Sequence, residues 1–311
     1  MAVTTGTAAN YKDLLDKLRL YLVAQGWTVN AWAPGAGAAD PSQLDVMGPG
    51  NVGGQQPKIG IQTDRDTVTN AYTWQVGAYP QYNAALGYGQ QNNNSPSVNL
   101  CLWDNTMEYW FYVNNTRFIV IAKIGTYYMS MYAGFFLPYA LPAEYPYPYY
   151  VGATYATKQP FNYVNGAMRS FADPGRGAAY YMRRESLTWC IFHNSDQQFN
   201  VDDAYYGLTD SAIIWPYRSF FGDNDESYPY DLGVAFFQYM RPPVGGKMPL
   251  FQLQIMDLPE RVIPGCLDGV FATGGFNRIS EQTLIDGPDT YRLFINVYRN
   301  TPKGFFAVLE N

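Results

Sequence analysis

The chain has 311 residues, 47% of them hydrophobic, which is enough for a large buried core and excludes a globally disordered protein. Only 15% are charged and the net charge is −6, so the chain has no basic surface for nucleic acid as its main partner. Aromatic residues reach 17%, with 28 tyrosines, which predicts contact surfaces rich in rings that carry a polar tip.

The cysteines predict free thiols. Cys101, Cys190 and Cys266 are odd in number and widely spaced, which does not fit a disulfide framework. The first residues lack the basic and then apolar layout of a signal peptide. The longest apolar stretch, Tyr127 to Leu141, is short and interrupted by Pro138, so we expect no membrane span.

One helix is predicted near the start of the chain. Apolar Leu14, Leu15, Leu18 and Leu22 recur at helical spacing. Asn10 is suited to the N-cap and Gly26 to the end of the helix. We expect this helix to dock on a sheet of its own chain, and the alternative is insertion into a neighbouring subunit.

The rest of the chain predicts a mainly β fold of antiparallel meander or sandwich-type sheets, with long loop-rich insertions. Asn114-Asn115 and Gly125-Thr126 separate three β-rich runs as two tight turns, the first through positive φ at asparagine. Such short connections leave no room for helical crossovers, which predicts antiparallel pairing. Strands are expected at Trp27–Trp32, Lys58–Thr63, Thr67–Val76, Val98–Trp103, Glu108–Val113, Arg117–Ile124, Tyr127–Leu137, Leu187–Phe192, Ala212–Trp215, Pro249–Met256, Val270–Thr273, Tyr291–Val297 and Phe305–Leu309.

Three regions follow from this pattern. Residues 1–140 carry the helix and an antiparallel β core, 141–248 are a loop-rich region dense in Tyr, Pro and Gly, and 249–311 form a C-terminal β module. The three could also be one continuous domain. Gly35–Asp40 and Gly48–Gln56 are expected to be loops between strands.

Residues suited to catalysis are few, and we expect neither an enzyme nor a cofactor. His193 is the single histidine, and strand alternation puts it on the opposite face from Cys190. The glycine-rich run at Gly48–Gly54 lacks the lysine and the helix of a phosphate loop. Oxygen ligands suit calcium, which makes Asp223, Asp225 and Glu226 weak metal candidates, but they do not follow the EF-hand spacing. A solvated acidic turn is the simpler interpretation.

The strongest functional signal is a run of rings and prolines. Proline stiffens the backbone, so neighbouring rings are presented at low entropic cost. Three uses remain open: contact with another subunit, stacking on a surface glycan, or folding back onto the chain's own sheet. The candidate interface residues are Phe135, Phe136, Tyr139, Glu144, Tyr145, Tyr147, Tyr149 and Tyr150.

The same block resembles a family of tailed-bacteriophage virion proteins. Its matching residues are Trp110-Phe111, Arg117-Phe118-Ile119, Ala122-Lys123, Tyr132–Ala140 and Glu144–Pro148. Similar segments are LDVMGPGNVGGQQPKIGIQT, FADPGRGAAYYMR, IIWPYR and the ending from Leu267, so that the resemblance covers Tyr11 to Leu309. It implies a virion structural component of the tail or baseplate and brings no catalytic residues. The tyrosine-rich stretch after Glu144 and the run Asn92–Asn94 depart from the family pattern.

These observations predict a tail or baseplate subunit, assembled in the host bacterial cytoplasm and located in the virion tail. Its expected partners are other virion proteins and copies of itself in a homo-oligomeric ring. The first alternative is a host-adsorption protein that binds a receptor or surface glycan. The second is a neck or head-decoration protein.

Overall fold

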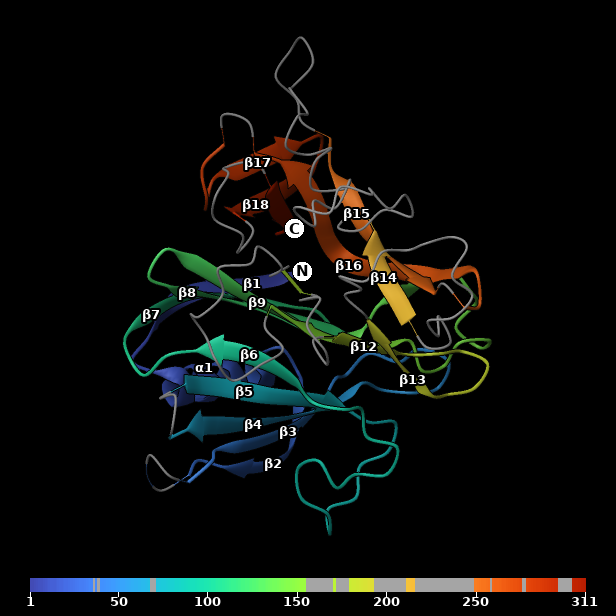
Figure 1. Ribbon diagram of the computed structural model, residues 1–311, viewed down its shortest axis with the longest axis horizontal. Coiled ribbons are helices and arrows are strands. Elements are labelled where there is room, and N and C mark those ends of the chain that lie inside the picture. Colours follow the sequence, from blue (N-terminus) through green and yellow to red (C-terminus); the bar gives the residue numbers. More distant parts are fainter. Residues whose placement is uncertain are drawn as a thin grey trace, which may run out of the picture.

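The computed structural model of the protein, shown in Figure 1, describes residues 1–35, 37, 40–67, 71–154, 170–171, 179–192, 211–215, 249–257, 259–275, 278–295 and 304–311. The fold is mainly β, with two sheets and one N-terminal helix among these residues, as the sequence predicted. The smaller sheet is an antiparallel meander in the order β2-β3-β4-β5-β6. Its strands are β2 (Thr28–Ala33), β3 (Gln43–Met47), β4 (Lys58–Asp66), β5 (Ala71–Ala78) and β6 (Val98–Leu102).

The larger sheet runs in the order β1-β7-β8-β9-β11-β12-β13-β14-β15-β16-β19-β18-β17, and β10 pairs with β16 beside this path. Its neighbours are antiparallel except for β13 and β14, which are parallel. The strands are β1 (Ala2–Ala8), β7 (Met107–Val113), β8 (Arg117–Ile124), β9 (Tyr127–Phe135), β10 (Leu137–Pro138), β11 (Tyr149–Ala153), β12 (Ala179–Met182), β13 (Trp189–Phe192), β14 (Ser211–Trp215), β15 (Phe251–Asp257), β16 (Val262–Gly274), β17 (Thr283–Asp286), β18 (Asp289–Ile295) and β19 (Gly304–Leu309).

Strands β7 to β9 form a middle layer with a core on each face. Figure 1 shows the smaller sheet on one side of these strands and β15 to β18 on the other. Along β8, Phe118 and Val120 enter the core beside the smaller sheet, whereas Ile119 and Ile121 enter the core beside the C-terminal strands. Because both faces are buried, β8 reads as a nearly continuous apolar run instead of an alternating one.

The helix α1 (Tyr11–Ala24) has the caps that its sequence predicts. The side chain of Asn10 accepts hydrogen bonds from the backbone N–H groups of Lys12 and Asp13, and Gly26 follows the last turn at φ +82°. Leu14, Leu15, Leu18 and Leu22 are buried in the core that the helix shares with the smaller sheet. The helix therefore docks within its own chain.

The predicted β7–β8 and β8–β9 hairpins are both present, but the mechanism expected for the first turn is wrong. Neither Asn114 nor Asn115 has positive φ. Instead, the Asn114 side chain accepts hydrogen bonds from the N–H groups of Thr116 and Arg117, both at 2.9 Å. The second turn uses positive φ at Gly125, where φ is +62°.

Hydrogen bonds cross both boundaries between the three predicted regions. Strand β9 pairs with β11 across the first boundary, and β14 pairs with β15 across the second. The core between the middle layer and the C-terminal strands contains residues as far apart in the chain as Trp110 and Val308. In the described residues, strands from all three regions thus join in the larger sheet, while β2 to β6 of the first region form the smaller one.

A polar clamp joins the C-terminal strands to the middle layer. One carboxylate oxygen of Glu281 accepts hydrogen bonds from Lys123 Nζ at 2.7 Å and from the Tyr128 hydroxyl at 2.6 Å. Burial acts to raise the pKa of Glu281, but the bonds from Lys123 and Tyr128 and the charges of Lys123 and Arg292 outweigh it and leave this pKa lowered.

The stabilising effect of this clamp should depend on pH. A carboxyl whose pKa is lower in the folded state stabilises the fold above its ordinary pKa of 4.5 and loses that effect as pH falls through the folded pKa. We expect Glu281→Gln to lower the free energy of unfolding at pH 7, with the gap to the wild type closing below pH 4.5. Urea denaturation of both proteins across this range measures the gap. A gap that stays constant down to acid pH would contradict the assignment.

Candidate interaction surface

Five of the eight predicted interface residues lie inside the molecule. Phe135, Phe136, Tyr145, Tyr149 and Tyr150 are each at most 2% exposed. Consecutive rings of β11 enter opposite cores: Tyr149 packs on Phe135 beside the smaller sheet, whereas Tyr150 lies in the core beside the C-terminal strands. The expectation that these five rings face another subunit is therefore wrong, and here the segment folds back onto its own chain.

The hydroxyl groups of these buried tyrosines are satisfied within the chain. Tyr149 accepts a hydrogen bond from Lys58 N at 3.0 Å and donates one to the Tyr79 carbonyl at 2.9 Å. The hydroxyl of Tyr150 donates to the Phe171 carbonyl at 2.9 Å, and that of Tyr145 donates to the carbonyl of Met182. Each ring thus anchors the segment through apolar packing and through a polar tip.

The glycine-rich loop packs closely on the same segment. A Cβ atom on Gly53 would lie 2.2 Å from the Pro142 carbonyl oxygen and 2.8 Å from Pro146 Cα, and this residue has φ +58°. Only glycine fits such a close approach in this backbone conformation. The run Gly48–Gly54 was predicted to be a loop, and the structure adds that it supports the turn after β10.

The exposed part of the segment lies between these anchors. Tyr139 is 56% exposed and Leu141 is 67% exposed. Glu144 is exposed and accepts a hydrogen bond from Leu141 N at 3.2 Å, while Tyr147 is half-buried against the core beside the smaller sheet. Of the eight predicted residues, Tyr139 and Glu144 therefore present exposed side chains.

Strand β10 joins this exposed part to the start of β16. Leu137 pairs with Cys266 and Pro138 with Gly265, and Tyr139 N donates to the Pro264 carbonyl at 2.9 Å. Val262 and Ile263, at the start of β16, are also exposed. We call the exposed apolar side chains of these two segments the β10 patch; they are Leu137, Tyr139, Leu141, Val262 and Ile263.

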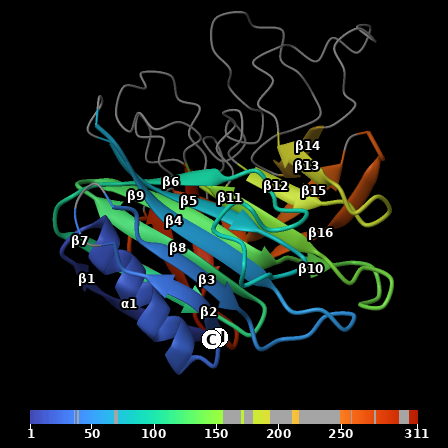
Figure 2. The ribbon, with the colours of Figure 1, turned by 90° about the horizontal axis from the view of Figure 1, so that it is seen from below.

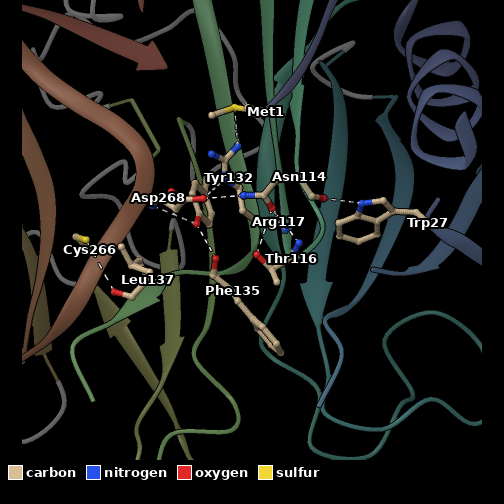
Figure 3. A network of polar contacts seen from close by, with 10 residues as sticks. All are labelled: Met1, Trp27, Asn114, Thr116, Arg117, Tyr132, Phe135, Leu137, Cys266 and Asp268. Atoms are coloured by element: carbon tan, nitrogen blue, oxygen red, sulfur yellow. Dashed lines mark hydrogen bonds and ion pairs between the residues drawn. The ribbon is translucent and has the colours of Figure 1, made fainter. Parts of the chain in front are cut away.

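A buried polar network lies beneath one end of β10 (Figure 3). Arg117 is fully buried, and its Nε lies 3.2 Å from Asp268 Oδ2, which also accepts a hydrogen bond from Asn114 Nδ2 at 2.7 Å. The Tyr132 hydroxyl donates to the Phe135 carbonyl at 2.7 Å, and the Arg117 guanidinium lies over its ring. The network therefore fixes the β7–β8 turn and the end of β9 relative to β16.

The remaining candidates are the predicted metal ligands, the histidine and the cysteines. Asp223, Asp225, Glu226 and His193 lie outside the described residues. The three cysteines are free and buried, and burial raises the pKa of Cys266 to about 11, which keeps its thiol protonated. The described ranges contain no group of three metal-ligating side chains. They also contain no helix of the length and apolarity needed to cross a bilayer.

Sequence reasoning missed most of the β10 patch. Val262 and Ile263 lie about 120 residues from Leu141, and no local pattern indicates that the two segments pair. One signal was available: Pro138 lacks a backbone N–H, which is compatible with a short strand beside the main path of a sheet. Leu137 and Leu141 give no separate signal, because aromatic rings dominate the pattern around them.

No model of a known protein family matches the chain, and no curated protein matches it.

Proposed function

We propose that this chain is a structural component of a tailed-bacteriophage virion, a tail or baseplate subunit that acts through contacts with other subunits. The observation that carries the proposal is the β10 patch, in which two segments joined by backbone pairing both carry exposed apolar residues. Adjacent exposed apolar residues with firm support beneath them are typical of a protein–protein contact.

The support comes from the anchors on either side of the patch. Phe136 packs edge-on against Tyr145, with ring centroids 5.4 Å apart, and Tyr139 N is bonded to the backbone of β16. A surface held in this way loses little conformational entropy when a partner covers it. The resemblance of Tyr132–Ala140 and Glu144–Pro148 to virion proteins supports the same function.

Aspartate substitutions in the patch test this function. We expect Tyr139→Asp and Leu141→Asp to fold like the wild type but to be depleted at least about tenfold from assembled tails, because a buried unpaired charge opposes docking. Ile279→Asp is the matched control, since Ile279 is an exposed apolar residue outside the patch. Quantitative blotting of purified particles against the soluble fraction provides the measurement.

Two further measurements separate the alternatives. Electron microscopy of virions that carry a labelled copy should place the label on the tail, and a label on the head or neck would overturn the tail assignment. Binding of the isolated protein to a glycan array would favour host adsorption. If both aspartate variants enter particles at the control level, the β10 patch is not the contact.

A further inference from the structure

Strand β1 forms an open edge of the larger sheet. It pairs only with β7, and its seven residues run from Ala2 opposite Val113 to Ala8 opposite Met107 without a register shift. Within the described residues, no backbone hydrogen bond from β1 is recorded other than those of this ladder. The outward N–H and C=O groups of β1 can therefore accept another strand.

The opposite edge of the same sheet is protected in the usual ways. Strand β17 has only four residues and ends in Asp286, with Asp289 just beyond the turn. Short length and charge discourage a sheet edge from pairing with another chain. Strand β1 has neither feature, and its sequence AVTTGTA also lacks proline and a bulge. The chain thus leaves one edge open and blocks the other.

The residues of β1 suit pairing with themselves. In a two-fold antiparallel pair, residues that face each other must share a sheet face, so the axis passes through a single residue. The register that pairs all seven residues has its axis at Thr5, which sets Ala2 against Ala8 and Val3 against Thr7. Thr5 is exposed, and threonine facing threonine is a favourable cross-strand pair.

The surroundings of β1 fit a second copy as well. The chain carries a net charge of −6, yet β1 has no charged side chain, so the paired strands themselves would bring no like charges together. Gly6 lets the ring of Tyr109 lie across the strand, since a Cβ there would be 2.8 Å from the Tyr109 hydroxyl oxygen. Figure 2 shows α1 on the same side of the molecule as β1.

An exposed apolar pair extends this surface. Leu20 and Val23, on the outward side of α1, are both about half exposed. An open pocket of about 460 Å³, lined by Met1, Ala2, Gln25 and the β7–β8 turn, lies between the end of α1 and the start of β1. The open edge and the apolar end of the helix are therefore adjacent parts of one surface.

We propose that β1 pairs antiparallel with β1 of a second copy about a two-fold axis at Thr5, joining two large sheets into one. This surface is separate from the β10 patch, so the pairing does not depend on the function proposed above. A two-fold pair closes on itself and needs only one open edge in each copy. A ring built by joining the larger sheets edge to edge would need a second open edge, but the other edge of this sheet is the protected strand β17.

A charge-swap experiment tests the pairing. At the axis, Thr5 of one copy faces Thr5 of the other, so Thr5→Lys sets like charges opposite each other, and so does Thr5→Glu. We expect the wild type to sediment as a dimer and each variant to associate at least about tenfold more weakly. An equimolar mixture of the two variants should restore the dimer, because lysine then faces glutamate. Sedimentation velocity over a range of concentrations measures the association of the wild type, of each variant and of the mixture.

Two controls distinguish a loss of β1 pairing from misfolding and from effects of charge at another edge. Ile285→Lys places the same charge on the protected edge strand β17 and should leave the dimer intact. Far-UV circular dichroism should be unchanged in every variant, because Thr5 and Ile285 are exposed. A monomeric wild type, dimers that withstand both single substitutions, or a mixture that fails to restore association would overturn the proposal.

Discussion

Asp268→Ala is expected to destabilise the protein by about 3–5 kcal/mol, whereas Arg117→Met should cost only about 1–2 kcal/mol. The two side chains form one ion pair, but their exposures differ: Arg117 is fully buried and Asp268 is 35% exposed. Without Asp268 the guanidinium stays buried beside the Met1 sulfur, a weak acceptor at 3.3 Å, with one of its nitrogens already unpaired. Without Arg117, the carboxylate of Asp268 keeps its hydrogen bond from Asn114 and its contact with water.

Urea denaturation of the two variants and of the double variant measures this asymmetry. We expect Arg117→Met to rescue part of the loss from Asp268→Ala, because removing the unpaired cation removes its desolvation cost. If Asp268→Ala cost no more than Arg117→Met, Arg117 would have to reach water or another anion in the folded state. The double variant also shows whether the network of Figure 3 acts as a unit.

Truncation of two tyrosines in the same segment should change stability by very different amounts. Tyr149→Ala is expected to cost about 3–5 kcal/mol, because it opens a cavity beside Phe135 and leaves Lys58 N without its partner. Tyr139→Ala should change stability by less than about 0.5 kcal/mol, since its ring is mostly in solvent. Thermal or urea unfolding provides the comparison.

Tyr149→Phe isolates the polar part of this effect. The ring is kept, so the expected cost is about 1–3 kcal/mol, for the loss of the hydrogen bonds to Lys58 and Tyr79. Equal costs for Tyr149→Ala and Tyr139→Ala would contradict the division of the segment into buried anchors and an exposed patch.

The sequence predicted those elements whose signals are local. The α1 caps at Asn10 and Gly26 lie beside the helix they bound, and the β7–β8–β9 meander follows from short turns between apolar runs. Strand β1 was missed because alanine, threonine and glycine give no apolar alternation, and its partner β7 is about 100 residues away. A pairing between strands so far apart in the chain forms only when the larger sheet assembles.

Strand β11 shows a different limit of sequence reasoning. Its rings follow Pro146 and Pro148, which favoured a loop, yet the strand begins directly after the second proline. A strand buried on both faces has no polar side to reveal its period, so Tyr149 and Tyr150 look like exposed rings although each fills a separate core. Most of the predicted interface residues are therefore buried, whereas Tyr139 and Glu144 of the same segment are exposed.

The distance along the chain between β1 and β7 also constrains biosynthesis. Strand β1 leaves the ribosome before β7, and its partner is complete only when Val113 has been added. At typical elongation rates of about 5–20 residues per second, this interval is roughly 5–20 s. During translation β1 therefore has two unsatisfied edges instead of one, and nascent chains on neighbouring ribosomes could pair there before either has folded.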